Sequence, residues 1–148
     1  MEPQVSLLVA GGAALIPMIM GAIFYGPVFG KQWMNSLGYT EENIPEPIKM
    51  AIVYPVSLVL SLALAFFLET VIEHLHKGVS EAGELMFTSF HTFSHGAYHG
   101  FQIALVIVMP VLITNLMFQR NTLSNILLNV AYWLITISLM AGVMDAFA

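Results

Sequence analysis

The feature that most constrains this chain is the spacing of its charged residues. Four long stretches contain no Asp, Glu, Lys or Arg: residues 3–30, 50–68, 85–119 and 121–144. A helix needs roughly 20 apolar residues to cross the hydrocarbon core of a bilayer. Only helices satisfy their own backbone hydrogen bonds in lipid, and the alternation typical of barrel strands is absent. The pattern therefore predicts an all-α integral membrane protein, a bundle of four transmembrane helices.

Composition supports this class and excludes others. The chain is 58% hydrophobic and 9% charged, whereas a soluble domain carries about 25% charged residues. It has no cysteine, which excludes disulfides, thiolate metal sites and a cysteine nucleophile. The net charge is −5 and the few Lys and Arg residues are not clustered, so we expect the lipid bilayer and not nucleic acid as a partner.

We expect one transmembrane domain over residues 1–148, with helices at about 5–28, 49–75, 83–118 and 122–146. Gly26-Pro27 is typical of a helix stop, and Lys31, Gln32 and Trp33 suit an interfacial anchor in the loop that follows. The third helix is long, and its first half is amphipathic and rich in histidine. Asn121 or Thr122 is expected to cap the fourth helix.

The loop charges predict the orientation of the chain. Four crossings place both termini on one side, with Lys31, Lys49 and Arg120 on the other and Lys77 alone on the side of the termini. The positive-inside rule then predicts a multi-pass protein of the inner (plasma) membrane with both termini outside the cytoplasm.

Small residues at helical spacing predict close helix contacts, because lipid provides no hydrophobic drive for helix association. Ser57, Ser61 and Ala65 form one stripe, and Ser138 and Gly142 belong to a second. Such stripes serve contacts within one bundle or between copies, so a homo-oligomer or a complex with other membrane subunits is expected. Asn115, Asn125 and Asn129 are expected to make hydrogen bonds between helices.

Histidines and carboxylates form the candidate site. His91, His95 and His99 recur every fourth residue, and Glu73 with His76 has the Glu-x-x-His spacing of carboxylate metal bundles. Imidazoles one turn apart can share a metal ion. We therefore predict a site for a divalent transition metal (zinc, iron or copper) at Glu73, His76, His91, His95 and His99. Two alternatives stay open: a proton relay through the imidazoles, and a polar patch that faces water or a partner.

Two segments resemble a known family. Tyr25–Met34 resembles the signature after the first helix of the domain-of-unknown-function family 1761, a group of small, mostly bacterial membrane proteins. Asn115–Arg120, followed by Asn129–Trp133 and Gly142, resembles the end of the same family. The resemblance implies about four membrane helices and no known activity. Apart from a His-Gly pair like His99-Gly100, the segment His91–His99 departs from the family pattern.

Three functions follow as hypotheses. The first is a non-enzymatic protein that acts by assembly, because little chain lies outside the predicted helices. The second is a small channel or transporter for protons or metal ions, based on the histidines and on Pro17, Pro55 and Pro110 inside three helices. The third is a membrane metalloenzyme that uses the same histidine and glutamate cluster.

Overall fold

The computed structural model describes residues 7–46, 48–75, 77–79, 83, 85–87 and 91–147. As predicted, it has four helices long and apolar enough to cross a membrane, Leu7–Val28, Met50–Leu75, Phe93–Phe118 and Leu123–Ala146. The elements along the chain are α1 (Leu7–Ile23), η1 (Phe24–Val28), α2 (Gly30–Leu37), α3 (Met50–Leu75), β1 (Lys77–Val79), β2 (Leu85–Phe87), α4 (Phe93–Ile103), η2 (Ala104–Val108), α5 (Met109–Phe118) and α6 (Leu123–Ala146). The segment η2 is a single π-helical turn that continues α4, whereas η1 contains a kink at Gly26.

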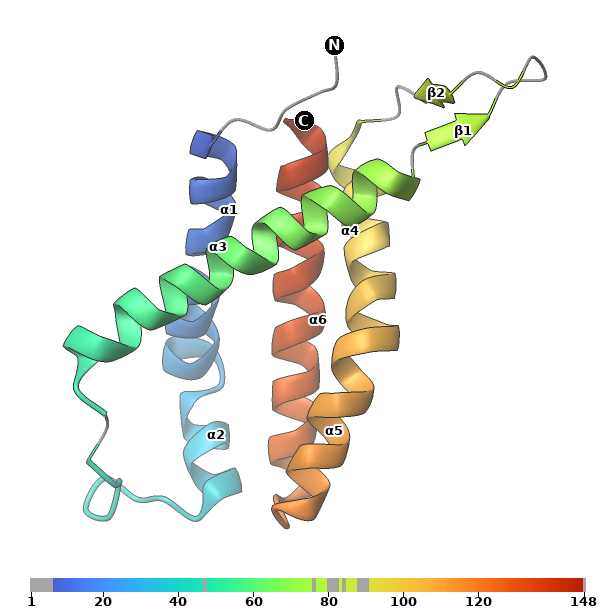
Figure 1. The fold of residues 1–148 in the computed structure, drawn as a ribbon. Helices are drawn as coiled ribbons and strands as arrows, with labels where there is room; N and C mark the ends of the chain where they lie inside the picture. The colour runs from blue at the N-terminus through green and yellow to red at the C-terminus, as the bar shows by residue number, and fades with distance from the viewer. Residues whose placement is uncertain are drawn as a thin grey trace.

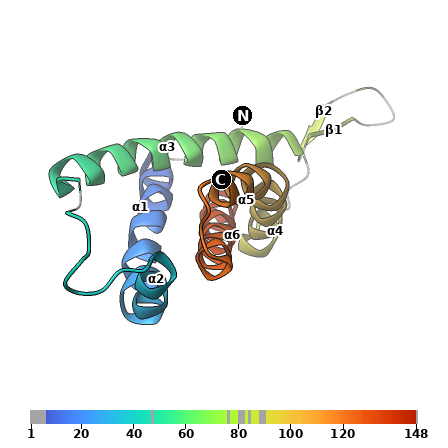
Figure 2. The ribbon, with the colours of Figure 1, turned by 90° about the horizontal axis from the view of Figure 1, so that it is seen from below.

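Helix α6 occupies the centre of the molecule. Helix α1 flanks it on one side, and the continuous α4–η2–α5 helix flanks it on the other (Figures 1 and 2). Helix α3 lies obliquely across one face of these three helices, so the molecule is not a simple bundle of four parallel helices (Figure 2). The start of α1 and the end of α6 lie at the same end of the molecule (Figure 1).

The oblique course of α3 follows from where its buried residues lie. They are Ser61, Ala65, Leu68 and Ile72, all from residue 61 onward. They recur every three or four residues, which is the spacing of one helix face. Residues 50–60 include no buried residue. The part of α3 from Ser61 onward therefore packs closely on its neighbours, and the part before it diverges from them.

The segment after the first crossing differs from the prediction. Residues 31–37 were expected in a loop, but they belong to α2, which begins at Gly30. The backbone of Gly26 (φ −99°, ψ −108°) breaks the preceding helix four residues before that start. The hydroxyl of Ser36 accepts a hydrogen bond from Asn125 Nδ2 (3.1 Å), and its carbonyl accepts one from Thr122 Oγ1 (2.9 Å). These bonds fix α2 against the start of α6, and Gly38, at φ 72°, ends α2 in the left-handed conformation.

The start of the third crossing was also predicted wrongly. A helix was expected from about residue 83, but Leu85–Phe87 form strand β2, which pairs antiparallel with β1 (Lys77–Val79). Helix α4 begins only at Phe93, after Thr92. The hydroxyl of Thr92 accepts a hydrogen bond from the backbone N–H of His95 (3.3 Å) and so caps the helix. The paired strand β2 and the threonine cap thus lie where the start of a helix was expected.

Pro110 explains the widened turn η2 in the same crossing. Proline has no N–H for the carbonyl four residues earlier, and its ring pushes that carbonyl away. The helix accommodates this by a single π-helical turn, Ala104–Val108, just before the proline.

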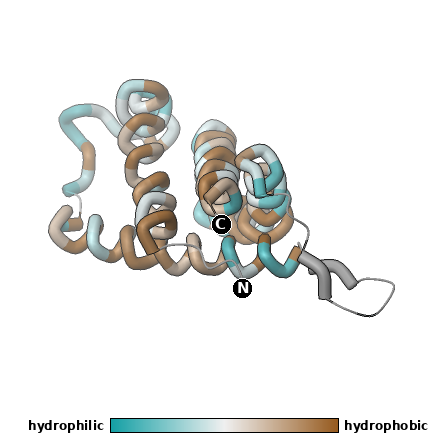
Figure 3. Tube along the Cα trace, turned by 90° about the horizontal axis from the view of Figure 1, so that it is seen from above, coloured by the Kyte–Doolittle hydropathy of each residue, from teal (hydrophilic) through white to brown (hydrophobic). Residues whose placement is uncertain are grey.

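The outer surface of the helices is apolar. Large hydrophobic side chains such as Leu8 (86% exposed), Val106 (71%) and Val111 (71%) point away from the other helices. Hydrophobic residues cover most of the helical trace, and hydrophilic ones gather mainly at helix ends and in loops (Figure 3). A surface this apolar is suited to lipid contact, as the composition predicted.

Hydrogen bonds between helices involve two of the three predicted asparagines. Asn125 donates to Ser36 of α2 (3.1 Å), and Asn129 Oδ1 accepts from the phenol of Tyr25 (3.2 Å). Asn115 instead accepts a bond from Gln119 on the next turn of its own segment (3.3 Å). Thr122 caps α6, as predicted, because its hydroxyl accepts from the N–H of Asn125 (3.2 Å).

The contact between α1 and α6 is held by a buried hydrogen bond. Tyr132 Oη donates to the carbonyl of Pro17 (2.7 Å). A Cβ added to Gly21 would lie 3.6 Å from this hydroxyl, at ordinary van der Waals distance, so the phenol lies directly beside α1. The ring of Tyr132 packs against those of Phe24 and Tyr25, with centroid distances of 5.8 and 5.1 Å.

Replacing this tyrosine tests the contact. We expect Tyr132→Phe to destabilise the protein by about 1 kcal/mol, the usual net value of one hydrogen bond. Thermal unfolding in detergent, followed by the retained size-exclusion peak, would measure the loss. Tyr98→Phe is the matched control, since Tyr98 is 59% exposed on α4. Equal melting curves for both variants would contradict the role given to the Tyr132 hydroxyl.

Candidate functional site

The candidate site is built on the close contact between α4 and α6. A Cβ added to Gly96 would lie 2.3 Å from Asp145 Cβ and 2.5 Å from the carbonyl oxygen of Ala141. A Cβ added to Gly100 would lie 2.5 Å from Ala141 Cβ. Only glycine fits at these two positions without a shift of the facing backbone. Gly96 and Gly100 form a Gly-x-x-x-Gly pair, which lets helix backbones approach closely in membranes.

Gly142 makes the reciprocal contact from α6. Its added Cβ would lie 2.8 Å from the ring of Phe93 and 2.9 Å from the carbonyl oxygen of the same residue. The first turn of α4 therefore lies directly on the last turns of α6.

Asp145 lies at the centre of this contact. Its side chain has no exposed surface, although it stands only one residue before the end of α6. His91 Nδ1 lies 3.1 Å from Oδ1 of Asp145, and His95 Nδ1 lies 3.5 Å from Oδ2. The first distance is that of a hydrogen bond; the second is a longer polar contact. One carboxylate thus joins two imidazoles, one on each of its oxygens.

A third imidazole extends the array along α4. His95 Nε2 and His99 Nε2 are 3.1 Å apart, and the two rings stand nearly perpendicular with their centroids 4.5 Å apart. The polar groups therefore follow one another in the order His91, Asp145, His95, His99.

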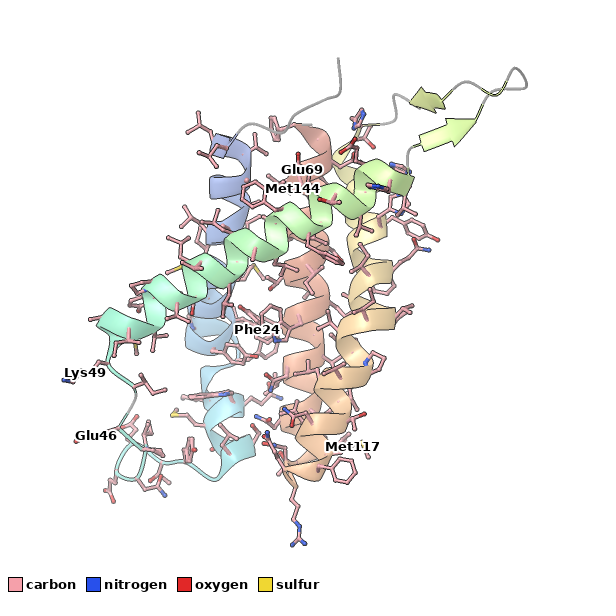
Figure 4. All side chains as sticks on the ribbon, viewed as in Figure 1. Phe24, Glu46, Lys49, Glu69, Met117 and Met144 are labelled. Atoms are coloured by element: carbon pink, nitrogen blue, oxygen red, sulfur yellow. The ribbon has the colours of Figure 1, made fainter. Side chains whose placement is uncertain are left out.

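The array leads from the end of the molecule toward its interior. The side chains of His91 and His95 are 26% and 35% exposed. His99 lies one helical turn, about 6 Å, further along α4 than His95. Figure 4 labels Met144, the residue before Asp145, near this end of α6, where α3 also passes. A proton or small ligand would reach the array at His91 and His95.

The structure brings together part of the predicted metal set. His91, His95 and His99 contribute to the array, Glu73 is half-buried on α3, and His76 lies outside the described residues. No three His, Asp or Glu side chains are placed to hold one metal ion in the part of the chain that the structure describes. The imidazoles and the carboxylate form a line and do not surround a point.

The sequence patterns did not predict Asp145 or the two glycines as residues of the site. Asp145 only marked the end of an uncharged stretch, and nothing in the local pattern shows that it is buried. Gly96 and Gly100 did carry a signal, because a Gly-x-x-x-Gly pair in an apolar helix marks a contact face. Combined with the small residues near the end of α6, that signal would have placed the histidine segment against Asp145.

The predicted packing residues lie in several environments. Ser61, Ala65 and Gly142 are buried within the chain, whereas Ser57 and Ser138 are partly exposed. The hydroxyl of Ser138 donates to the Leu134 carbonyl in its own helix (2.7 Å). Contacts within one chain therefore use a large part of both stripes.

Comparison with known proteins gives one match. Residues 8–144 match the model of a family described as a protein of unknown function, DUF1761. The chain belongs to this family. No curated protein and no solved structure matches it. Family membership confirms the resemblance of the two segments and assigns no activity, so a function for this DUF1761 protein has to be argued from the array itself.

Gly96→Ala tests the α4–α6 contact. We expect a marked loss of folded protein, because the new methyl group would meet Asp145 Cβ and the Ala141 backbone, and overpacking of this kind costs about 1–3 kcal/mol. Fluorescence-detected size-exclusion chromatography would report the folded yield. Gly12→Ala on α1 is the matched control, since its Cβ would meet nothing within 4 Å. Equal yields for the two variants would contradict the close contact.

The hydrogen-bond order also predicts the tautomers of the histidines. With Asp145 ionised, His91 and His95 each present Nδ1–H to the carboxylate. His95 Nε2 is then the acceptor, so His99 carries its proton on Nε2. Nitrogen-15 solid-state NMR of His-labelled protein in lipid would distinguish the tautomers at neutral pH. If His95 carried its proton on Nε2, the proposed order of donors and acceptors would be wrong.

Proposed function

We propose that this protein binds protons at one membrane surface and relays them through His91, Asp145, His95 and His99. The supporting observation is the burial of Asp145 with an imidazole Nδ1 near each of its oxygens, at 3.1 and 3.5 Å. An ionisable residue inside a membrane helix is expensive and usually marks a functional site. Imidazole is the side chain that exchanges protons most readily near neutral pH.

The cost of burying Asp145 supports a role beyond packing. A carboxylate removed from water is costly unless hydrogen bonds or opposite charge replace its hydration. An alanine or serine would fill the space beside Gly96 without that cost. Two imidazoles offset the cost here, and each of them can also accept or release a proton.

The relay can be written as balanced proton transfers. A proton that binds His91 Nε2 makes an imidazolium, which passes its Nδ1 proton to Oδ1 of Asp145 and becomes neutral again. A proton that arrives at His99 is passed in the same way through His95 to Oδ2. In the resting tautomers both branches therefore lead to Asp145. Release of the proton from Asp145 into the opposite branch requires the imidazoles of that branch to change tautomer. An imidazole changes tautomer when it gains a proton at one ring nitrogen and loses one from the other.

A metal site has less support than a relay in the described residues. A zinc site needs three or four ligands around one point at about 2.0–2.2 Å. Among the described residues the close pairs are His91 with Asp145 and His95 with His99, each at 3.1 Å, and no third ligand joins either pair around one point. Assembly with a second copy remains a separate prediction, but Ser61, Ala65 and Gly142 are already buried within the chain.

Proton flux into liposomes tests the proposal. Purified protein would be reconstituted with a trapped pH-sensitive dye, and a potassium diffusion potential would drive proton entry. We expect flux above the protein-free leak for the natural chain, and loss of that excess in Asp145→Asn and in His95→Gln. Asparagine keeps the shape of Asp145 but cannot take up a proton, so this variant separates packing from relay.

His74→Gln is the matched histidine control. His74 is exposed on α3, and its Nδ1 lies 2.7 Å from the Thr70 carbonyl oxygen of the same helix. This variant should keep full flux. Undiminished flux in folded Asp145→Asn would refute the relay. Loss of flux after treatment with a chelator, restored by zinc, would replace the relay with a metal site.

A further inference from the structure

A second site lies between α1, α3 and α6, away from the histidines. A cavity of about 920 Å³ is bounded there by Gly21 and Tyr25, by Ser57 and Ser61 of α3, and by Asn129 and Tyr132 of α6. This volume is within the range of about 300–1,000 Å³ typical of small-molecule sites. The cavity exists because the part of α3 before Ser61 diverges from α1 and α6.

The cavity is elongated along α3. Its lining on this helix extends from Met50 to Leu64, a distance of about 21 Å along a helix axis. A hydrocarbon chain with a small head group matches this length.

The lining carries no Asp, Glu, Lys, Arg or His, so a charged group has no counter-ion inside the cavity. Its polar side chains include Tyr25 and Asn129, joined by a hydrogen bond of 3.2 Å. These two residues lie toward the α2 end of the molecule, where Trp33 also contributes. Further along α3 the lining continues with Leu60 and Leu64, and Ser57 and Ser61 lie beside them.

The geometry points to a binding site for an uncharged membrane amphiphile, with an oxygen-bearing head group beside Tyr25 and Asn129 and a hydrocarbon tail along α3. The phenol oxygens of Tyr25 and Tyr132 donate to Asn129 and Pro17, and they keep lone pairs that accept from a ligand hydroxyl. The indole N–H of Trp33 can donate to a carbonyl. Two sources share this chemistry: a prenylated quinone and a diacylglycerol.

This inference does not depend on the proton relay. Asn129 and Asp145 are 16 residues apart on α6 by their numbers, about 24 Å along a helix. A substitution in the cavity can therefore leave the histidine array unchanged, and the two proposals can fail separately.

Tryptophan fluorescence provides the test, because the chain has two tryptophans and both line the cavity. The protein would be reconstituted in lipid vesicles and titrated with a decyl-chain quinone, or in parallel with a brominated diacylglycerol. Both probes quench indole emission at short range. We expect saturable quenching by at least one probe, above the non-saturating quenching that brominated phosphatidylcholine produces from the bulk bilayer.

Ser57→Phe should abolish the saturable component, because the larger ring fills the cavity beside α1. Val59→Phe is the matched control, since Val59 is 64% exposed on the same helix and should keep the component. Saturation by the quinone alone or by the diacylglycerol alone identifies the source. Absence of saturation with both probes, or equal saturation in Ser57→Phe, overturns the site. If the natural chain shows no saturable quenching and Ser57→Phe changes the oligomeric mass, the amphiphile site is overturned and the cavity is instead a contact with a second copy.

Discussion

The close approach of α4 to α6 is the constraint on which the rest of the structure depends. Lipid does not drive apolar helices together, so the contact relies on backbone proximity and dispersion. Gly96 and Gly100 provide that proximity, because no larger side chain fits between their backbone and Ala141 or Asp145. The same contact buries Asp145 and places His91 and His95 on its two oxygens. Packing and the candidate chemistry therefore come from one pair of helices.

Helix α6 also organises the opposite end of the molecule. Its first turns carry Thr122, Asn125 and Asn129, which bind α2 and η1 through side-chain hydrogen bonds. Between the two ends, α6 buries apolar residues such as Ile137 and Met140. The hydrogen bonds to α2 and η1 and the contacts of Asp145 thus lie at opposite ends of α6. Helix α6 therefore borders the histidine array at one end and an uncharged cavity near the other.

Sequence patterns predicted those features that depend on local chemistry. The uncharged stretches located four crossings, although the third helix begins at Phe93 and not near residue 83. Long-range features were not accessible in the same way. The burial of Asp145 depends on glycines about 45 residues earlier, and the oblique course of α3 depends on close packing from Ser61 onward. Neither leaves a periodic signal in its own segment.

Asp145 occupies an electrostatically unfavourable position within its own helix. A carboxylate in the last turn of a helix faces the negative end of the helix dipole, which disfavours the ionised form. Asp145 is nevertheless placed in the last turn of α6, and its Cβ faces Gly96 in the first turn of α4. The positive end of the α4 dipole and the two imidazoles therefore compensate for an unfavourable position. The contact that buries the carboxylate therefore also supplies the groups that offset its burial, so neither α4 nor α6 alone could hold Asp145 in this place.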